Sequence, residues 1–113
     1  MGAPLTKEDG LIDWARPAKE LHCLVRGLDP WPTAFSYLDG KKLQFFAPDV
    51  VYQDVRQPPG TVLFADKRGL LVACGENALL LREVQAAGKK RLPVASFLLG
   101  QKIAAMSRFT VSP

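Results

Sequence analysis

The sequence predicts a mainly β domain of the α+β class, in which a small antiparallel sheet forms a barrel after one amphipathic helix. The chain has 113 residues, of which 48% are hydrophobic, and this is enough for one hydrophobic core. One segment has helical periodicity, and six short β-rich segments follow it with turn residues between them. A barrel is favoured over an open sheet because closure removes exposed strand edges.

The helix is predicted over residues 16–28. Proline is tolerated in a first helical turn, which suits Pro17, and the segment DPWP at 29–32 ends the helix because prolines cannot continue its hydrogen bonds. The apolar residues follow the i, i+3, i+4, i+7 pattern and are Leu21, Leu24, Val25 and Leu28. This spacing places all four on one face, which we expect to pack against the barrel.

The strands are predicted from β-branched and aromatic residues bounded by turn signals. The six segments are 33–37, 42–47, 50–55, 61–65, 70–74 and 78–84. The turn signals between them are LDGK at 38–41, QPPG at 57–60, DKRG at 66–69 and GEN at 75–77. A short C-terminal helix is predicted over 93–99, with Pro93 at its start and Gly100 after its end.

Residues 1–10 are polar and lack periodicity, so they are predicted to be a linker or tail, and the folded domain is predicted to span 11–113. No apolar segment has the length of a membrane span or the pattern of a secretory signal, so we expect a cytoplasmic protein with no membrane partner. Cys23 and Cys74 are too few for a zinc site or a disulfide framework and are expected to be free, buried thiols.

The positive charge is concentrated in the second half of the chain. Residues 1–53 carry 6 basic and 7 acidic side chains, whereas residues 54–113 carry 9 basic and 4 acidic ones. Three adjacent cations, Lys89, Lys90 and Arg91, follow the small residues of AAG at 86–88 and are expected on a loop. This distribution favours a polyanionic partner such as a nucleic acid.

The sequence offers no catalytic residues and no metal site. The single histidine, His22, lies in the amphipathic helix, where a structural or solvated role is more common than catalysis. No GxSxG, P-loop or GxGxxG motif is present. The large aromatic residues are expected mainly in the core, and they are Trp14, Trp31, Phe35, Phe45, Phe46, Phe64, Phe97 and Phe109.

Several short phrases occur in the order seen in the C-terminal domain of methionyl-tRNA formyltransferase. They are LTKED at 5–9, IDW at 12–14, VRGLDPWP at 25–32, PGTVL at 59–63, VACG at 72–75 and QAAGKK at 85–90. The resemblance covers almost the whole chain and continues through FLLG at 97–100 and SRF at 107–109. It implies an open OB-like β-barrel with a preceding helix, and it implies monomeric behaviour beside a catalytic domain.

In the family that the chain resembles, an N-terminal Rossmann-like domain transfers a formyl group from 10-formyltetrahydrofolate to initiator methionyl-tRNA. Its Asn, His and Asp catalytic set and its Ser-Leu-Leu-Pro folate loop have no counterpart in this sequence. The resemblance therefore implies an accessory domain that binds the tRNA acceptor arm through a basic surface, with no catalysis and no cofactor of its own.

The expected nucleic-acid-binding residues come from two sources. By resemblance, Lys7 matches a lysine of the family's basic interdomain linker, and Lys89 and Lys90 match its Gly-Lys-Lys loop. Charge distribution adds Arg91, Lys67, Arg68 and Lys102.

Two other functions remain open at the sequence level. The domain is a packing module of a related formyltransferase, such as 10-formyltetrahydrofolate dehydrogenase or an amino-sugar formyltransferase, or it is a free-standing OB-like binder of single strands. Salt-dependent tRNA binding would separate tRNA recognition from packing. A single-strand binder would need exposed aromatic residues on one sheet face.

Overall fold

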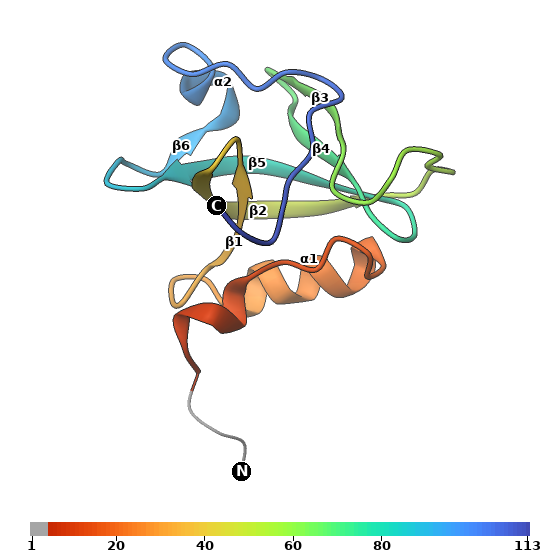
Figure 1. Ribbon diagram of the computed structural model, residues 1–113, viewed down its shortest axis with the longest axis horizontal. Helices are drawn as coiled ribbons and strands as arrows, with labels where there is room; N and C mark the ends of the chain where they lie inside the picture. Colours follow the sequence, from red (N-terminus) through yellow and green to blue (C-terminus); the bar gives the residue numbers. More distant parts are fainter. Residues whose placement is uncertain (1–4) are drawn as a thin grey trace.

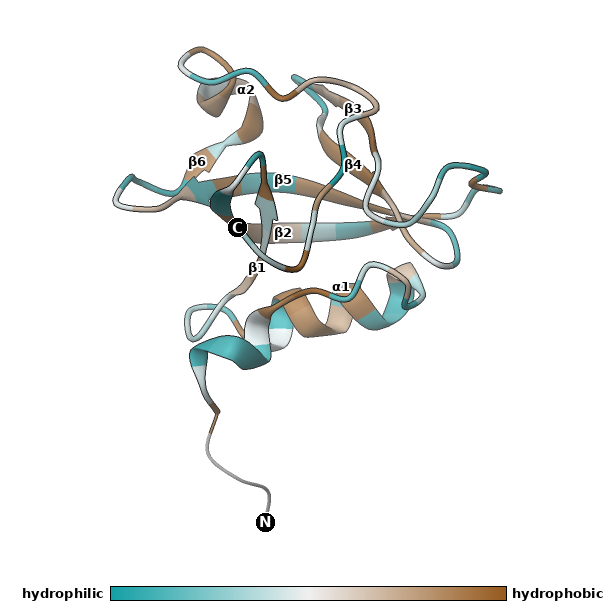
Figure 2. Cartoon of the chain, viewed as in Figure 1, coloured by the Kyte–Doolittle hydropathy of each residue, from teal (hydrophilic) through white to brown (hydrophobic). Residues whose placement is uncertain are grey.

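The computed structural model describes residues 5–113 and confirms a mainly antiparallel, OB-like α+β fold (Figure 1). The elements are the 3₁₀ helix η1 (Lys7–Gly10), α1 (Ala18–Gly27), β1 (Ala34–Leu38), β2 (Lys41–Val51), β3 (Val62–Asp66), β4 (Gly69–Ala73), β5 (Ala78–Ala86), β6 (Leu92–Pro93) and α2 (Val94–Phe97). The sheet order is β1-β2-β5-β4-β3, and β6 pairs with β5. Hydrophilic residues are concentrated in the loops, whereas β3 and β4 are mainly hydrophobic (Figure 2).

The prediction of separate strands at 42–47 and 50–55 is wrong, because one long strand, β2, extends through both segments as far as Val51. Ala47 has a φ of 52°, and the core-facing positions change parity there: Leu43 and Phe45 contact the core before it, and Val50 contacts the core after it. A strand is identified in a sequence by the alternation of apolar and polar residues. Because that alternation shifts by one residue at Ala47 and a proline follows, the sequence there resembles the end of a strand. The sixth strand is the short β6 instead.

The helix prediction is confirmed with a later start. α1 begins at Ala18, and Pro17 precedes it with extended backbone. Leu21, Val25 and Leu28 are buried as expected, whereas Leu24 packs against the core but is only partly buried. The predicted C-terminal helix is also present but ends at Phe97 rather than at residue 99.

Regular structure begins before Leu11. Residues 1–4 of the predicted linker lie outside the described residues, but Lys7–Gly10 forms η1, and Gly10 is buried. A Cβ atom on Gly10 would lie 1.9 Å from the carbonyl oxygen of Thr33, so only glycine allows this close approach. Beyond it, the Ile12 N–H donates to the Phe35 carbonyl at 2.9 Å, which attaches the N-terminal segment to β1.

The C-terminal segment 106–110 closes the barrel by bridging the two edge strands, β1 and β3. At β3, the Met106 N–H donates to the Val62 carbonyl at 2.7 Å, and the Val62 N–H donates to the Ser107 carbonyl at 2.8 Å. At β1, the Thr110 N–H donates to the Tyr37 carbonyl at 2.8 Å, and the Tyr37 N–H donates back at 3.2 Å. These bonds occupy edge groups that would otherwise be open to pairing with another chain.

A buried aromatic cluster lies beneath this closing segment. Phe109 packs against Trp14 and Phe45, with ring centroids 5.6 and 5.4 Å away. The Trp14 indole N–H donates to the Ser36 hydroxyl at 3.0 Å, and that hydroxyl donates to the Thr110 carbonyl at 3.1 Å. The buried polar groups therefore satisfy one another while joining the N-terminal segment, β1 and the C-terminal segment.

We expect Phe109→Ala to lower the free energy of unfolding by about 3 to 5 kcal/mol, because it removes a buried ring from this cluster. Urea denaturation followed by tryptophan fluorescence measures the effect. Met106→Ala is the matched control, since Met106 lies in the same segment but is 61% exposed. Equal midpoints for the two variants would contradict a structural role for the Phe109 ring.

The two cysteines differ in their environments, so the expectation of two buried thiols is only half correct. Cys23 is exposed on α1, whereas Cys74 is buried. Burial raises the pKa of the Cys74 thiol to about 12, so almost no thiolate is present at neutral pH. The structure therefore makes only Cys23 available to a thiol reagent in the folded protein.

At pH 8, we expect a chromogenic disulfide reagent to titrate one thiol in the folded protein and two in denaturant. Cys23→Ser should abolish the rapid reaction of the folded protein. Because the site is exposed, the substitution should change the free energy of unfolding by no more than about 0.5 kcal/mol. Rapid reaction of both thiols in the folded wild type would show that Cys74 is accessible.

Candidate nucleic-acid interface

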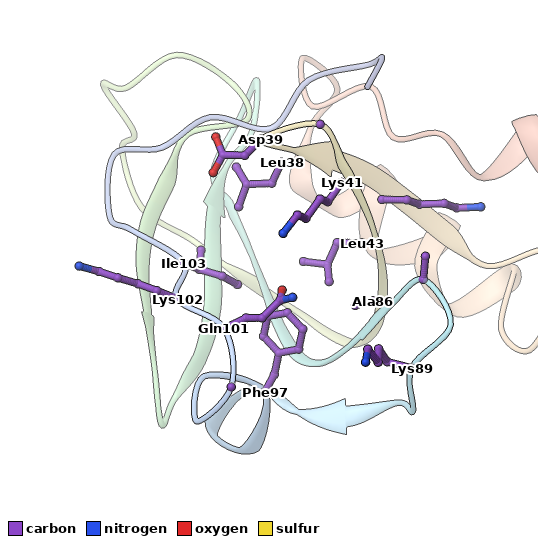
Figure 3. Close-up of a pocket in the computed structure, with 14 residues that line it drawn as sticks. Leu38, Asp39, Lys41, Leu43, Ala86, Lys89, Phe97, Gln101, Lys102 and Ile103 are labelled. Carbon is purple, nitrogen blue, oxygen red and sulfur yellow. The ribbon is translucent and has the colours of Figure 1, made fainter.

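A groove of about 750 Å³ lies between the β1–β2 hairpin, the β5–β6 turn and the segment that follows α2 (Figure 3). Three segments distant in the sequence form its walls. Its apolar lining includes Leu38, Leu43, Phe97 and Ile103, and its polar lining includes Asp39, Lys41, Lys42, Lys89, Gln101 and Lys102. The groove therefore combines four lysines with one carboxylate.

The β1–β2 hairpin determines which of its two lysines faces the groove. Asp39 and Gly40 both have positive φ, 51° and 79°, which is the two-residue turn geometry that matches the strand twist. In the resulting register, Lys41 lies on the same sheet face as the core residue Leu43. Lys42 lies on the other face, with its Nζ 4.3 Å from the centroid of the Phe35 ring.

The side chains around the groove point in different directions. Figure 3 shows the Lys41 amine pointing toward the middle of the groove and the Lys102 amine pointing away from it. Lys89 and Lys90 are both exposed on the β5–β6 turn, where Gly88 has a φ of 72°. None of these four lysines forms an ion pair with another residue of the described range 5–113.

Arg91 is engaged within the domain, unlike its neighbours Lys89 and Lys90. Its Nε donates to Glu83 at 2.6 Å, its Nη1 lies 3.2 Å from Asp29, and its guanidinium stacks 4.0 Å from the centroid of the Phe46 ring. Burial opposes the charged form, but the Glu83 hydrogen bond and the Asp29 charge outweigh it and raise the pKa of Arg91. Arg91 thus connects β5 to the end of α1 rather than offering a free cation.

Arg68 is also paired. It donates to both carboxylate oxygens of Asp66, and its guanidinium lies 3.7 Å from the centroid of the Phe64 ring. Its hydrogen bonds hold the pKa of the Asp66 carboxyl below its usual range. Most of its hydrogen-bonding capacity is therefore used within the β3–β4 turn.

The remaining sequence-predicted residues lie apart from the groove. Lys7 is exposed on η1, and Lys67 is exposed on the β3–β4 turn. These two segments lie at opposite ends of the molecule in Figure 1. The structure thus places Lys89 and Lys102 in the lining of one groove, with Lys90 next to Lys89 in the chain, and leaves Lys7 and Lys67 outside it.

Lys41 and Lys42, which line the groove, are not among the sequence-predicted binding residues. Two adjacent lysines directly after a glycine turn are the same signal that identified Lys89 and Lys90, but they lie in the half of the chain whose net charge is slightly negative. Averaging charge over that half concealed them.

The sheet does not present an open stacking surface among the described residues. Phe35 and Phe46 are buried on the outer face, and Lys42 and Arg91 cover their rings. The strongly exposed aromatic residues of the described range, Trp31 and Tyr52, lie in connecting segments. This arrangement does not favour the single-strand binder, which stacks bases on exposed aromatic residues.

Within residues 5–113, the structure shows no group of three or more His, Cys, Asp or Glu side chains placed to hold a metal ion. His22 is half-buried on α1, away from the groove. No helix in the same part of the chain is long and apolar enough to cross a membrane.

The chain matches the family model described as formyl transferase, C-terminal domain, over residues 4–102. It is similar to the methionyl-tRNA formyltransferase of Desulfotalea psychrophila, with 55% identity over 101 residues, which are 89% of this chain and 31% of that protein. The methionyl-tRNA formyltransferase of Geotalea daltonii is 47% identical over 100 residues, with 88% and 31% covered. The chain thus spans about a third of the length of these curated relatives.

Among solved structures, HypX from Aquifex aeolicus in complex with tetrahydrofolic acid has a similar fold, with a TM-score of 0.70. The identity is 22%, and the match covers 83% of this chain and 17% of HypX. A second HypX structure, a six-substitution variant, gives the same TM-score of 0.70 at 23% identity.

The element order and the closed sheet therefore define a small OB-like β-barrel domain with a basic groove at one end. This chain belongs to the formyl transferase C-terminal domain family. Its sequence is similar to the corresponding part of methionyl-tRNA formyltransferases, as the phrases in the sequence indicated.

We expect Arg91→Ala to lower the free energy of unfolding by about 1 kcal/mol, because it removes a cation–π contact and two partly exposed ion pairs. Lys90→Ala, which removes the same charge from the adjacent position, should change it by less than about 0.5 kcal/mol. Chemical denaturation of both variants measures the difference. Equal stabilities would mean that the Arg91 contacts contribute nothing in solution.

Proposed function

We propose that this chain is the tRNA-binding accessory domain of a methionyl-tRNA formyltransferase. In this proposal an N-terminal Rossmann-like domain binds 10-formyltetrahydrofolate and formylates initiator methionyl-tRNA, while this domain contacts the phosphate backbone of the acceptor arm. The whole protein is then a cytoplasmic monomer, and this domain alone performs no formyl transfer and binds no cofactor.

The observation that supports RNA binding is the group of unpaired lysines at one end of the barrel. Lys41, Lys89, Lys90 and Lys102 lie on or beside one groove and make no ion pair with another described residue. Several lysines without carboxylate partners at one end of the barrel raise the local positive potential, which attracts phosphate. A domain serving only as a packing module has no need for this arrangement.

Phosphate recognition also fits the chemistry of these side chains. Lysine is a compact point charge on a flexible stem, which suits contacts to phosphate that do not depend on precise geometry. The arginines best suited to planar, bidentate recognition, Arg68 and Arg91, are already paired. The proposed contacts therefore position tRNA without reading its bases.

We expect tRNA affinity to fall as the salt concentration rises. A plot of the logarithm of the association constant against the logarithm of the salt concentration should have a slope of about −0.7 to −0.9 for each phosphate contact. Lys89→Ala/Lys90→Ala should flatten that slope by about 1.4 to 1.8 units if each lysine makes one contact. Fluorescence anisotropy with labelled initiator tRNA, across a range of salt concentrations, measures both slopes. Elongator tRNA should give nearly the same values, because phosphate contacts carry little sequence information.

The matched control is Lys19→Ala/Arg26→Ala, which also removes two positive charges but from the exposed side of α1. Its slope should stay close to that of the wild type. Equal flattening in both double variants would indicate a general effect of net charge. Absence of salt-dependent binding in the wild type would favour the packing module.

A further inference from the structure

We infer that the groove is a binding pocket for a single unpaired nucleotide, with its base over the apolar floor and its phosphate at Lys41. This inference rests on the proposed function and extends it from the phosphate backbone to one nucleotide unit. The shared chemistry is a nucleoside monophosphate, supplied either by an unpaired residue of a bound RNA or by a free nucleotide.

The size and position of the groove fit such a ligand. Its volume of about 750 Å³ lies within the range of about 300 to 1,000 Å³ typical of small-molecule pockets, which are often found at the mouths of barrels. A phosphate group alone is far smaller than this space. A base-paired stem keeps its bases stacked inside the helix, so it offers nothing that enters the groove.

The floor of the groove is apolar. Leu43, Phe97 and Ile103 belong to the hydrophobic core and also line the groove. Contacts to phosphate oxygens do not need an apolar surface. A flat base, in contrast, is stabilised when it packs on such a surface and is removed from water. The apolar floor therefore indicates a ligand with a planar, poorly hydrated part.

Two polar side chains are placed to complete the recognition. The Lys41 amine points toward the middle of the groove, above the apolar residues (Figure 3). Gln101 also lines the groove, its N–H donates to the Phe97 carbonyl at 3.1 Å, and its side-chain amide offers both a donor and an acceptor. In one nucleotide, the Lys41 amine would bind the phosphate, the Gln101 amide would bind the edge of the base, and the apolar floor would contact the face of the base.

The charge balance of the groove favours an anion. Lys41 and Lys89 line the groove with a single acidic residue, Asp39, whereas the Lys102 amine points away from it. Asp39 occupies the turn itself, and it forms no ion pair with Lys41. The excess positive charge complements the phosphate of a nucleotide.

The test is a titration of the protein with AMP and CMP, followed by the methyl resonances of Leu43 and Ile103. We expect saturable shifts of these resonances, with ribose 5-phosphate and inorganic phosphate binding at least about tenfold more weakly because they lack the base. Equal binding of phosphate alone, or no shift with either nucleotide, would overturn the inference.

Lys41→Ala should weaken AMP binding by about tenfold, because it removes the charged partner of the phosphate. Lys19→Ala, which removes the same charge from α1, outside the groove lining, should leave it unchanged. Both positions are exposed, so both variants should keep the wild-type unfolding midpoint. Equal AMP affinity in the wild type and in folded Lys41→Ala would contradict the placement of the phosphate.

Two RNA hairpins identify the source of the nucleotide. One has a blunt, fully paired stem, and the other carries a single-stranded overhang on the same stem. If only the overhang hairpin shifts the Leu43 and Ile103 methyls, the groove takes an unpaired residue of RNA. If AMP shifts them and neither hairpin does, the groove takes a free nucleotide.

The failure of this inference is distinguishable from that of the proposed function. Salt-dependent tRNA binding without any response to AMP, CMP or the overhang would leave the phosphate surface intact and remove the nucleotide pocket. AMP binding without tRNA binding would support the nucleotide pocket and contradict the proposed tRNA-binding surface.

Discussion

Closure of the barrel by the segment 106–110 is the constraint on which the rest of the structure depends. The sheet has two open edges, β1 and β3, and this segment hydrogen-bonds to both. The Trp14–Ser36–Thr110 chain of hydrogen bonds and the Phe109 ring fix the segment against the core. Residues 100–103 lead into this segment and form one wall of the groove, so the same contacts hold the groove in shape.

The cations of the domain have two distinct roles, which depend on their side-chain chemistry. The guanidinium groups of Arg68 and Arg91 each cover an aromatic ring and bind carboxylates, so they belong to the folded structure. Within residues 5–113, Lys41, Lys89 and Lys102 of the groove lining have neither kind of partner, whereas Lys42 covers Phe35. Planar, delocalised arginine suits the first role, and compact lysine suits the second. Adjacent residues such as Lys90 and Arg91 therefore differ in their contacts although they carry the same charge.

Local signals in the sequence predicted the elements well. Helical spacing located α1, the Asp39–Gly40 turn located the first hairpin, and proline followed by glycine located α2. The long strand β2 was missed because the positive φ of Ala47 shifts the core-facing positions by one residue. Nothing in the local sequence reveals that shift.

The long-range features were beyond sequence reasoning for a different reason. Ser36 and Thr110 are separated by 74 residues, and the groove joins segments from three parts of the chain. Such pairings depend on the closed sheet and leave no local pattern. The same limit explains the mixed outcome for the basic residues: charge could be counted in advance, but whether a cation had a partner depended on contacts such as Arg91 with Asp29.

The groove also shows how the geometry of a turn sets the direction of a side chain in the groove wall that contains it. The positive φ values of Asp39 and Gly40 give a two-residue turn, and that turn sets the pairing of Leu38 with Lys41. Side chains alternate along a strand, so a slip of one residue would exchange the faces of Lys41 and Lys42. Leu43 would then leave the core, which makes the slip costly. The packing that stabilises the barrel therefore also fixes the direction of the lysine that enters the groove.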